Sequence, residues 1–162
     1  MAVEFATYPP SVSPPSNVRK EVGVFFRRTI FGEAFPIGAV VAAEAAIMSD
    51  EDVRLDTIRD ETGAVLAAMT SHLSLDDPNE WFIPRLAVHP DTRRRGFGRA
   101  VLSRLATDLV ATGRSIRRVT LCPYDTTSHE FYSSVGFSPD PDNSFEWNIH
   151  PILLTTPIVK TH

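Results

Sequence analysis

The sequence is poor in cysteine, with Cys122 as the only thiol among its 162 residues. A single thiol cannot form an internal disulfide or a zinc site that needs several cysteines. The histidines offer no substitute, because no two of them stand at the i, i+4 spacing of a helical metal site. We therefore expect no metal and a reducing compartment. Cys122 falls in a stretch that we interpret as a buried strand, where cysteine is a small apolar filler.

Long apolar runs and a net positive charge are also missing. No segment approaches the ~20 consecutive apolar residues of a membrane-spanning helix, and the first residues, MAVEFATYPPSVSPPS, do not resemble a signal peptide. The formal net charge is −4, whereas nucleic-acid binding through counterion release needs a broad cationic face. The sequence thus predicts a soluble, cytoplasmic protein with no membrane and no nucleic-acid partner. The arginine-rich runs 93–95 and 114–118 keep nucleic-acid binding as a rival hypothesis.

What the chain does contain is enough apolar material for one domain. Hydrophobic residues make up 43% of the sequence and charged residues 22%, which is typical of a globular domain that buries a core and shapes a cleft. We predict a single domain over residues 1–162. Residues 1–17 are its expected proline-rich N-terminal arm, because four prolines between Pro9 and Pro15 disfavour both helix and central strand.

Hydrophobic periodicity predicts helices and strands along the rest of the chain. In chain order we expect helical segments within 18–48 broken near 32–38, a hairpin of strands 53–60 and 64–75, a strand at 81–88, a helix at 98–113, a strand at 117–123, a helix at 126–136, and weaker strands at 144–150 and 151–158. Pro84 inside its strand indicates an edge, a bulge or a splayed position. The order of elements favours an α/β or α+β fold with a mixed sheet.

The stretch RRRGFGRAVL (93–102) places two glycines between the strand that ends at Val88 and the next helix. The free backbone N–H groups at a helix N-terminus, together with the helix dipole, make such a turn an anion site. Gly96 and Gly98 permit unusual φ angles, and the arginines add charged donors. Two common phosphate loops are excluded, because no Gly-Lys-Ser/Thr is present and Val101 replaces a third glycine. An ordinary turn beside a solvated arginine face is the alternative.

Two segments resemble the motifs of the GCN5-related N-acetyltransferase (GNAT) family. LAVHPDTRRRGFGRAVL resembles a strand ending in V-x-P that leads into Q/R-x-x-G-x-G/A, and it agrees at Val88, Pro90, Arg93, Gly96 and Gly98. DTTSHEFYSSVGF resembles N-x-x-A-x-x-F/L-Y-x-x-x-G-F, and it agrees at Phe131, Tyr132, Gly136 and Phe137, whereas Asp125 replaces Asn and Ser128 replaces Ala. The two motifs stand in the order and at the spacing of the family.

The resemblance implies a mixed, mostly antiparallel central sheet flanked by helices and splayed at the acetyl-CoA strand. It also implies acetyl-CoA as cosubstrate, no metal, and a turn whose backbone holds the coenzyme pyrophosphate. The end of the strand would pair with the pantetheine arm, and the N–H of Val88 or Ala87 would donate to the oxyanion. The residues expected at the coenzyme are Leu86, Ala87, Val88, Arg93, Arg94, Arg95, Gly96, Phe97, Gly98, Arg99, Ala100 and Asp125.

By the same resemblance, Tyr132 is the acid that protonates the coenzyme A thiolate, since the pKa of an unperturbed phenol is about 10. Packing in the core is its alternative role. Some relatives carry a glutamate base five residues before the motif Asn, but that position holds Thr120 here. Glu80 is the candidate substitute, acting through water, although a strand-end glutamate is often only solvated. Asp125 is a further candidate, with helix capping or a bond to pantetheine as its more ordinary roles.

The resemblance therefore predicts an acyltransferase that moves an acetyl group to a primary amine of a small molecule or peptide. Residues 18–75 and 138–158 would hold the acceptor, in regions without a common motif. The acidic stretches 49–56 and 74–80 are either attractive to a cationic amine or solvated turns. The missing base supports an alternative, an acyl-CoA-binding sensor or interaction domain with altered catalysis. Acylation of a hydroxyl, a longer acyl chain and a homodimer stay open.

Overall fold

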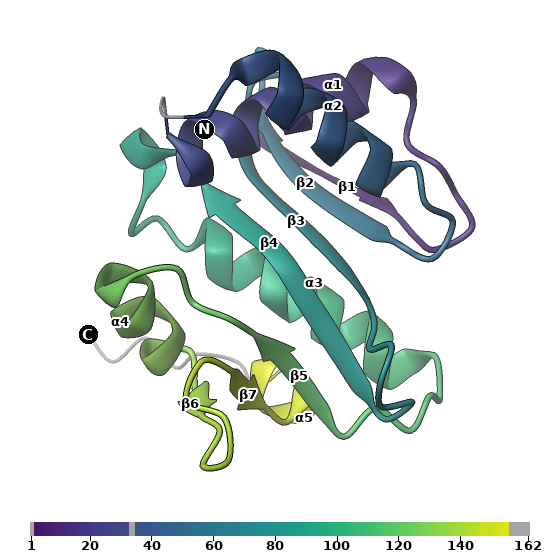
Figure 1. Ribbon diagram of the computed structural model, residues 1–162, viewed down its shortest axis with the longest axis vertical. Helices are drawn as coiled ribbons and strands as arrows, with labels where there is room; N and C mark the ends of the chain where they lie inside the picture. Colours follow the sequence, from purple (N-terminus) through teal and green to yellow (C-terminus); the bar gives the residue numbers. More distant parts are fainter. Residues whose placement is uncertain (1, 33–34, 156–162) are drawn as a thin grey trace. The chain divides into compact units, whose positions relative to one another are not determined.

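The computed structural model describes residues 2–32 and 35–155. Its elements are shown in Figure 1 and are, in chain order, β1 (Val3–Tyr8), α1 (Ser16–Phe26), the π-helical turn η1 (Arg27–Phe31), α2 (Ile37–Met48), β2 (Arg54–Asp60), β3 (Val65–Leu73), β4 (Glu80–Val88), the 3-10 turn η2 (Pro90–Thr92), α3 (Phe97–Ala111), β5 (Arg118–Leu121), α4 (Thr126–Ser134), β6 (Ser138–Pro139), β7 (Trp147–Ile149) and α5 (Pro151–Leu154). The strands follow the order β1-β2-β3-β4-β5-β7-β6 in one sheet.

The predicted fold class is confirmed, because helices flank a seven-stranded, mostly antiparallel sheet. The pairs β1–β2, β2–β3, β5–β7 and β6–β7 are antiparallel. Strand β4 lies between β3 and β5 in the order, so Pro84 does not mark an edge strand. The splay expected at β4 stays a prediction. Within residues 2–32 and 35–155, no helix has the length and apolar character to cross a membrane.

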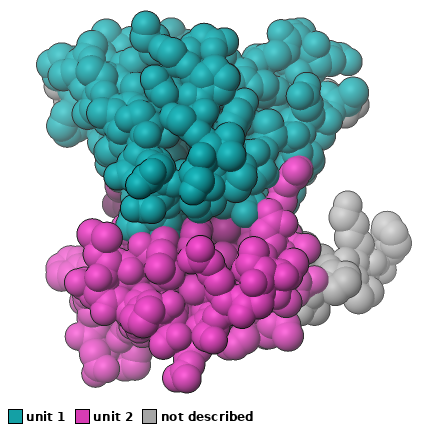
Figure 2. Space-filling model, turned by 90° about the vertical axis from the view of Figure 1, so that its right-hand side faces the viewer, with its two compact units in different colours: residues 1–72, 83–101 teal, residues 73–82, 102–162 magenta. Residues whose placement is uncertain are grey.

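The chain divides into two compact units, which are coloured separately in Figure 2. The N-terminal unit comprises residues 1–72 and 83–101, and the C-terminal unit comprises residues 73–82 and 102–162. The first residues of β4 therefore belong to the C-terminal unit, and its last residues belong to the N-terminal unit. The single domain expected from composition stays a prediction.

The N-terminal unit begins with a strand where the sequence predicts an arm. Residues 3–8 form β1, which pairs with β2 from Val3–Asp60 to Tyr8–Leu55. Between β1 and α1, which begins at Ser16, residues 9–15 lie outside regular structure. The reason is that the prolines come only after Tyr8, while VEFATY contains aromatic and β-branched residues that suit a strand.

Helices α1 and α2 lie on one face of strands β1–β3 and bury the core of the N-terminal unit (Figure 1). Val22, Phe26 and Met48 are at most 1% exposed. The two helices approach closely at Gly23, where an added Cβ would lie 3.2 Å from the carbonyl oxygen of Val41. The predicted break between the helices and the predicted β2–β3 hairpin are both confirmed.

A buried ion pair lies on β2. Arg54 donates from Nε to Asp56 Oδ2 at 2.8 Å and from Nη2 to Asp56 Oδ1 at 2.9 Å. The two side chains are 6% and 3% exposed, and Thr7 of β1 donates a further hydrogen bond to Asp56 Oδ1 at 2.8 Å. Asp56 is therefore neither solvated nor open to a ligand, unlike the exposed residues 50–52 of the same acidic stretch.

The C-terminal unit contains most of α3 together with β5, β7 and α4. The buried side chains of α3 in this unit are Leu102, Leu105, Ala106 and Leu109. The turn after α4 requires glycine at Gly136, where φ is 105° and an added Cβ would lie 2.9 Å from Cδ1 of Ile149. Gly136 thus ends the helix that the sequence predicts between 126 and 136.

Two expectations for the C-terminal unit are wrong. Strand β5 ends at Leu121, so Cys122 lies beyond the strand and is exposed. Residues 151–154 form helix α5 and not a strand, because Pro151 suits the first helical position and His150 Nδ1 accepts a hydrogen bond from the Ile152 amide at 3.3 Å. Residues 156–158 of that predicted strand lie outside the described residues. The strand expected within 144–150 is confirmed as β7.

Candidate active site

The turn between β4 and α3 lies in the N-terminal unit and is anchored at its start. The N–H of His89 donates to the Leu66 carbonyl of β3 at 2.7 Å. In η2, the N–H and the hydroxyl of Thr92 both donate to the His89 carbonyl, at 2.9 and 3.0 Å. Since Thr92 is itself buried, these bonds fix the path by which the chain leaves the strand.

Two residues of this turn have left-handed backbone conformations. The φ angle is 67° at Arg94 and 86° at Gly96. No atom lies within 4 Å of a Cβ added at Gly96, so a side chain would have space there. Glycine is favoured at this position because of its left-handed φ angle. Gly98 is already part of α3 and has no positive φ, which corrects the expectation that both glycines take unusual angles.

The first turn of α3 presents backbone donors beside a cluster of cations. The N–H of Ala100 donates to the Gly96 carbonyl at 2.9 Å, so the amides of Phe97 and Gly98 precede the first i→i−4 hydrogen bond of the helix. The helix dipole adds partial positive charge at the same end, and the arginines at 93–95 are exposed next to it. These donors and charges suit a phosphate group.

The other residues expected at the coenzyme lie on either side of the turn, except Asp125. On β4, Ala87 is buried in the core of the N-terminal unit, whereas Leu86 and Val88 are partly exposed. Arg99 is partly buried in the first turn of α3. One unit therefore contains the whole predicted coenzyme set apart from Asp125, which belongs to the C-terminal unit.

Asp125 caps helix α4. Its Oδ1 accepts a hydrogen bond from the Ser128 amide at 2.8 Å, which confirms the capping role. An asparagine side chain could accept the same bond, so the replacement of the family's Asn by Asp preserves the cap.

Tyr132 lies on α4 in the C-terminal unit and is 7% exposed. Its ring centroid is 5.1 Å from that of Phe131 and 5.6 Å from that of Phe137. Burial raises the pKa of the phenol well above its ordinary value, and the nearby Tyr124 and Asp125 raise this pKa further. The hydroxyl is therefore protonated at neutral pH, as an acid must be, although the same surroundings suit a packing role.

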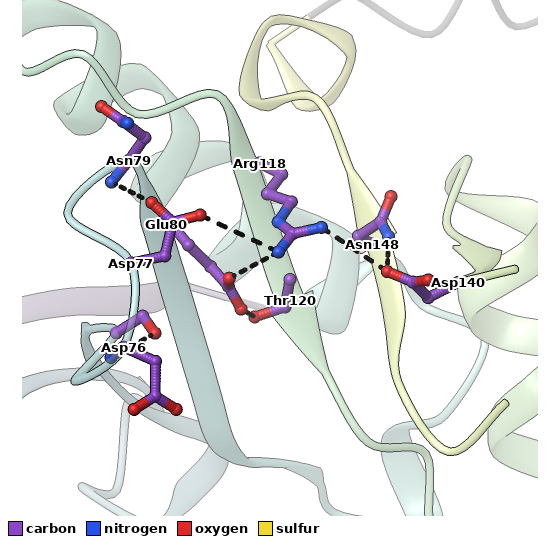
Figure 3. Close-up of polar contacts among 9 residues, drawn as sticks. Asp76, Asp77, Asn79, Glu80, Arg118, Thr120, Asp140 and Asn148 are labelled. Carbon is purple, nitrogen blue, oxygen red and sulfur yellow. Dashed lines mark hydrogen bonds and ion pairs between the residues drawn. The ribbon is translucent and has the colours of Figure 1, made fainter. Parts of the chain in front are cut away.

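Glu80 is the centre of a polar network in the C-terminal unit, shown in Figure 3. Its Oε1 accepts a hydrogen bond from Thr120 Oγ1 at 2.6 Å, and its Oε2 accepts one from Arg118 Nη2 at 2.9 Å. Thr120 is fully buried and Glu80 is 7% exposed. The interpretation of Glu80 as a merely solvated strand-end residue is therefore wrong.

The partner of Glu80 is the residue at which the resemblance places a base. Thr120 stands five residues before Asp125, the position that carries glutamate in some relatives. Glu80 reaches this hydroxyl from the neighbouring strand β4. Although position 120 holds threonine here and not glutamate, a carboxylate therefore lies next to it. The sequence names both residues but does not pair them, because they are separated by 40 positions.

Arg118 links Glu80 to further carboxylates (Figure 3). Its Nη1 lies 3.5 Å from Asp140 Oδ2, its Nη2 lies 3.9 Å from Asp77 Oδ2, and 40% of its side chain is exposed. Asn148 of β7 donates to the same oxygen of Asp140 at 3.4 Å. The hydrogen bond to Glu80 raises the pKa of the guanidinium above its ordinary value. Asp77 is thus part of a network, and the stretch 74–80 is not simply a solvated turn.

Glu146, which the sequence reasoning missed, borders this network. Burial raises the pKa of its carboxyl, the charges of Glu80 and Asp140 raise it further, and Arg118 acts in the opposite direction. Glu146 belongs to no motif, and it directly precedes β7 in the sequence. Among the residues that the structure describes, no group of three or more His, Cys, Asp and Glu side chains could hold a metal ion.

Comparison with known proteins decides the family. The model of the acetyltransferase (GNAT) family matches residues 27–137, a range that contains the turn at 93–98, Glu80 and Tyr132. The chain belongs to the GNAT family. Among the curated proteins, none matches the chain.

Solved structures share the GNAT fold at low sequence identity. A GNAT acetyltransferase from Staphylococcus aureus has a TM-score of 0.69 at 12% identity over 93% of this chain and 99% of that one. The ribosomal-protein-S18-alanine N-acetyltransferase from Escherichia coli has a TM-score of 0.63 at 18% identity over 99% of both chains. An aminoglycoside acetyltransferase from an uncultured soil metagenomic sample has a TM-score of 0.65 at 15% identity over 86% of this chain and 94% of that one. Identities this low show a common fold alone.

Proposed function

We propose that this GNAT protein is a cytoplasmic N-acetyltransferase that moves the acetyl group of acetyl-CoA to a primary amine of a small molecule or peptide. The observation that carries this function is the turn between β4 and α3. It combines the left-handed Gly96, the first backbone amides of α3 and three exposed arginines at one point. Membership of an acetyltransferase family supports acetyl-CoA as the ligand of this turn.

Each part of the coenzyme has a proposed partner. The backbone amides at 96–98 hold the pyrophosphate, and the arginines at 93–95 supply charge-assisted hydrogen bonds to phosphate. Leu86 to Val88 pair with the pantetheine arm through their backbone. The N–H of Val88 or Ala87 donates to the oxyanion that forms when the amine attacks the thioester carbonyl.

Tyr132 is the proposed acid for the departing thiolate. Its raised pKa keeps the phenol protonated at neutral pH, and proton donation to the leaving group lowers the barrier to carbon–sulfur cleavage. Glu80 is the proposed carboxylate of the base, acting through water because its side chain is only 10% exposed. Its hydrogen bond with Thr120 places it beside the position of the family's glutamate.

Proteins that share the fold include an aminoglycoside acetyltransferase and a ribosomal-protein-S18-alanine N-acetyltransferase. The second name states an N-acetylation, whose product is an amide, as in the reaction proposed for this chain. We place the acceptor class at primary amines, with small molecules and peptides as the two kinds to be tested.

Gly96→Ala tests the turn, and Gly63→Ala is its matched control. The φ angles are 86° and 88°, and no atom lies within 4 Å of an added Cβ at either glycine. Left-handed alanine should therefore cost both variants a similar ~1 kcal/mol of stability. Acetyl-CoA at ~100 times its Kd should add ~2.7 kcal/mol to the unfolding free energy of wild type and Gly63→Ala, and less to that of Gly96→Ala.

Urea or thermal unfolding with and without acetyl-CoA measures these differences. A wild-type protein that acetyl-CoA does not stabilise would refute coenzyme binding altogether. Equal stabilisation of both glycine variants would refute the role of the turn while leaving coenzyme binding in place.

Thiol release from acetyl-CoA in the presence of a panel of amines tests catalysis. The panel includes an aminoglycoside and a peptide with an N-terminal alanine. Tyr132→Phe should lower kcat by about 100-fold or more, whereas the control Tyr124→Phe, at a residue that is 52% exposed, should keep the wild-type rate. Acetyl-CoA binding without turnover of any amine would favour the sensor alternative.

A further inference from the structure

Arg118, the first residue of β5, bridges Glu80 to the segment that follows β6 (Figure 3). Its Nη2 donates to Glu80 Oε2 at 2.9 Å, and its Nη1 donates to Asp140 Oδ2 at 3.5 Å. A guanidinium is planar and rigid, so the position of one of its amino groups fixes the position of the other. The side chain of Arg118 therefore relates the place of the Glu80 carboxylate to that of Asp140.

Asp140 is itself held at both of its carboxylate oxygens. Its Oδ1 accepts a hydrogen bond from the Asp142 amide at 2.8 Å, and Asn148 of β7 donates to its Oδ2 at 3.4 Å. The backbone N–H of Asp140 donates to the Glu146 carbonyl at 2.8 Å. The far side of the Arg118 guanidinium is thus bound to a carboxylate that main-chain and side-chain donors keep in place.

The hydrogen bonds from Arg118 and Thr120 orient the Glu80 carboxylate without using all of its acceptor capacity. Thr120, which is fully buried, donates to Oε1 at 2.6 Å, and Arg118 donates to Oε2. Each carboxylate oxygen has two lone pairs, so each oxygen can accept a further hydrogen bond in a direction that its first donor limits. A water that contacts the exposed tenth of the side chain would bind in such a direction.

Arg118 is too exposed to contribute much as a structural ion pair. Its side chain is 40% exposed, and ion pairs that contact water to this extent add little to stability. The Arg54–Asp56 pair on β2 is the opposite case, with side chains only 6% and 3% exposed. The hydrogen bonds from Arg118 to Glu80 and Asp140 therefore matter mainly for the direction in which the Glu80 carboxylate points.

We propose that Arg118 is a positioning residue that orients the Glu80 carboxylate toward the water through which it takes a proton from the acceptor amine. This role rests on the proposed N-acetyltransferase function, in which Glu80 is the base. Arg118 acts only through its hydrogen bond to Glu80. The orientation matters because proton transfer requires the base to lie within hydrogen-bond reach of the proton, directly or through one water.

The proton balance of the reaction closes with Glu80 and Tyr132. A bridging water takes one proton from the acceptor ammonium and passes one of its own to Glu80, which leaves a neutral amine. The amine nitrogen forms a bond with the acetyl carbonyl carbon, the carbon–sulfur bond breaks, and the sulfur takes the proton of Tyr132. The nitrogen gives its second proton to the tyrosinate, and Glu80 releases its proton to solvent. One ammonium and one thioester thus yield one amide, one thiol and one proton.

Arg118→Ala tests this role, and Arg117→Ala is its matched control. Both variants lose one positive charge at neighbouring positions, and Arg117 is exposed. Arg118→Ala should lower kcat/KM by about 3- to 10-fold, the value of one hydrogen bond, through kcat and not through the KM for acetyl-CoA. Arg117→Ala should keep the wild-type rate. Arg118→Lys should retain part of the rate, because an ammonium can donate to Glu80 but lacks the planar fork that also reaches Asp140.

A double-mutant cycle separates positioning from a general effect of charge or folding. If Arg118 acts through Glu80, Arg118→Ala should cause no further loss of rate in a Glu80→Gln background. Guanidinium ion, added far below denaturing concentrations, should restore part of the rate of Arg118→Ala and none of the rate of the double variant. Stabilisation of every variant by acetyl-CoA is measured alongside and should equal that of wild type.

An unchanged rate in Arg118→Ala, an equal loss in Arg117→Ala, or the same loss with and without Glu80 would each overturn the positioning role and leave the N-acetyltransferase function standing. If Arg118→Ala does not fold, Arg118→Lys carries the same comparison between the Glu80 and Glu80→Gln backgrounds. A wild-type protein that binds acetyl-CoA but acetylates no amine would overturn the proposed function and this role with it.

Discussion

Each unit of this GNAT protein carries an arginine–carboxylate network on its strands, and the two networks differ in burial and in balance. In the N-terminal unit, Arg54 and Asp56 form a one-to-one pair whose side chains are 6% and 3% exposed. In the C-terminal unit, Arg118 is 40% exposed and lies within 4 Å of three carboxylates. The first network is closed to solvent and charge-balanced, and the second is open and has an excess of acidic groups.

The difference separates a structural role from a chemical one. A closed pair has its charge and its hydrogen bonds satisfied inside the protein, so it offers nothing to a ligand. In an open network with more carboxylates than cations, pKa values shift, as at Glu146, where burial and then the charge of Glu80 raise the pKa. Removing one partner of the first network should therefore lower the stability of the fold. Removing one partner of the second should change mainly the pKa values and the activity.

The largest effect on stability is expected at the closed pair. Arg54→Ala leaves the Asp56 carboxylate buried without its cation, which should cost about 3–5 kcal/mol of unfolding free energy. Urea denaturation measures this loss. The double variant Arg54→Met with Asp56→Leu removes both charges and should recover most of it. If Arg54→Ala were as stable as wild type, the contrast between closed and open networks would disappear.

A smaller effect is expected for Glu80→Gln in the open network. Unfolding free energy should fall by about 1 kcal/mol, because Arg118 reaches solvent and Gln can still accept the hydrogen bond from Thr120. Near neutral pH, kcat/KM should fall by about 10-fold, which corresponds to ~1.4 kcal/mol of barrier. Steady-state kinetics and urea denaturation on the same preparation give both numbers. A loss of stability as large as that of Arg54→Ala, with no loss of rate, would make this network structural as well.

The smallest effect is the pH-dependent stability of Glu146→Gln. Because folding raises the pKa of Glu146, its contribution to stability is full below the unfolded pKa and is lost as the pH rises through the folded pKa. The stability of Glu146→Gln relative to wild type should therefore increase between pH 4 and pH 7, by at most about 0.5 kcal/mol because solvent screens the partly exposed group. Urea denaturation at the two pH values measures the change, and a shift of opposite sign would contradict the raised pKa.

The sequence predicts best the features that depend on neighbouring residues. The turn at 93–98 is set by Gly96, by the motif around it and by the helix that follows, all within a few positions. The start of α4 follows from the cap at Asp125, and the left-handed glycines Gly113 and Gly136 come shortly after the ends of α3 and α4. Residues 3–8 and 151–154 were misassigned because short segments with few signals take their conformation from the partner they meet: β2 for the first, and the capping His150 for the second.

Contiguous motifs were enough to recognise the family and to predict the turn between β4 and α3, since the backbone conformation of each motif is local. Which acidic residues are buried and paired became visible only in the fold. Asp56 is buried against Arg54, while Glu80 of β4 meets Thr120 and Arg118 of β5. Burial and charge–charge distance set the pKa of a carboxyl, and neither is defined until strands distant in sequence have paired.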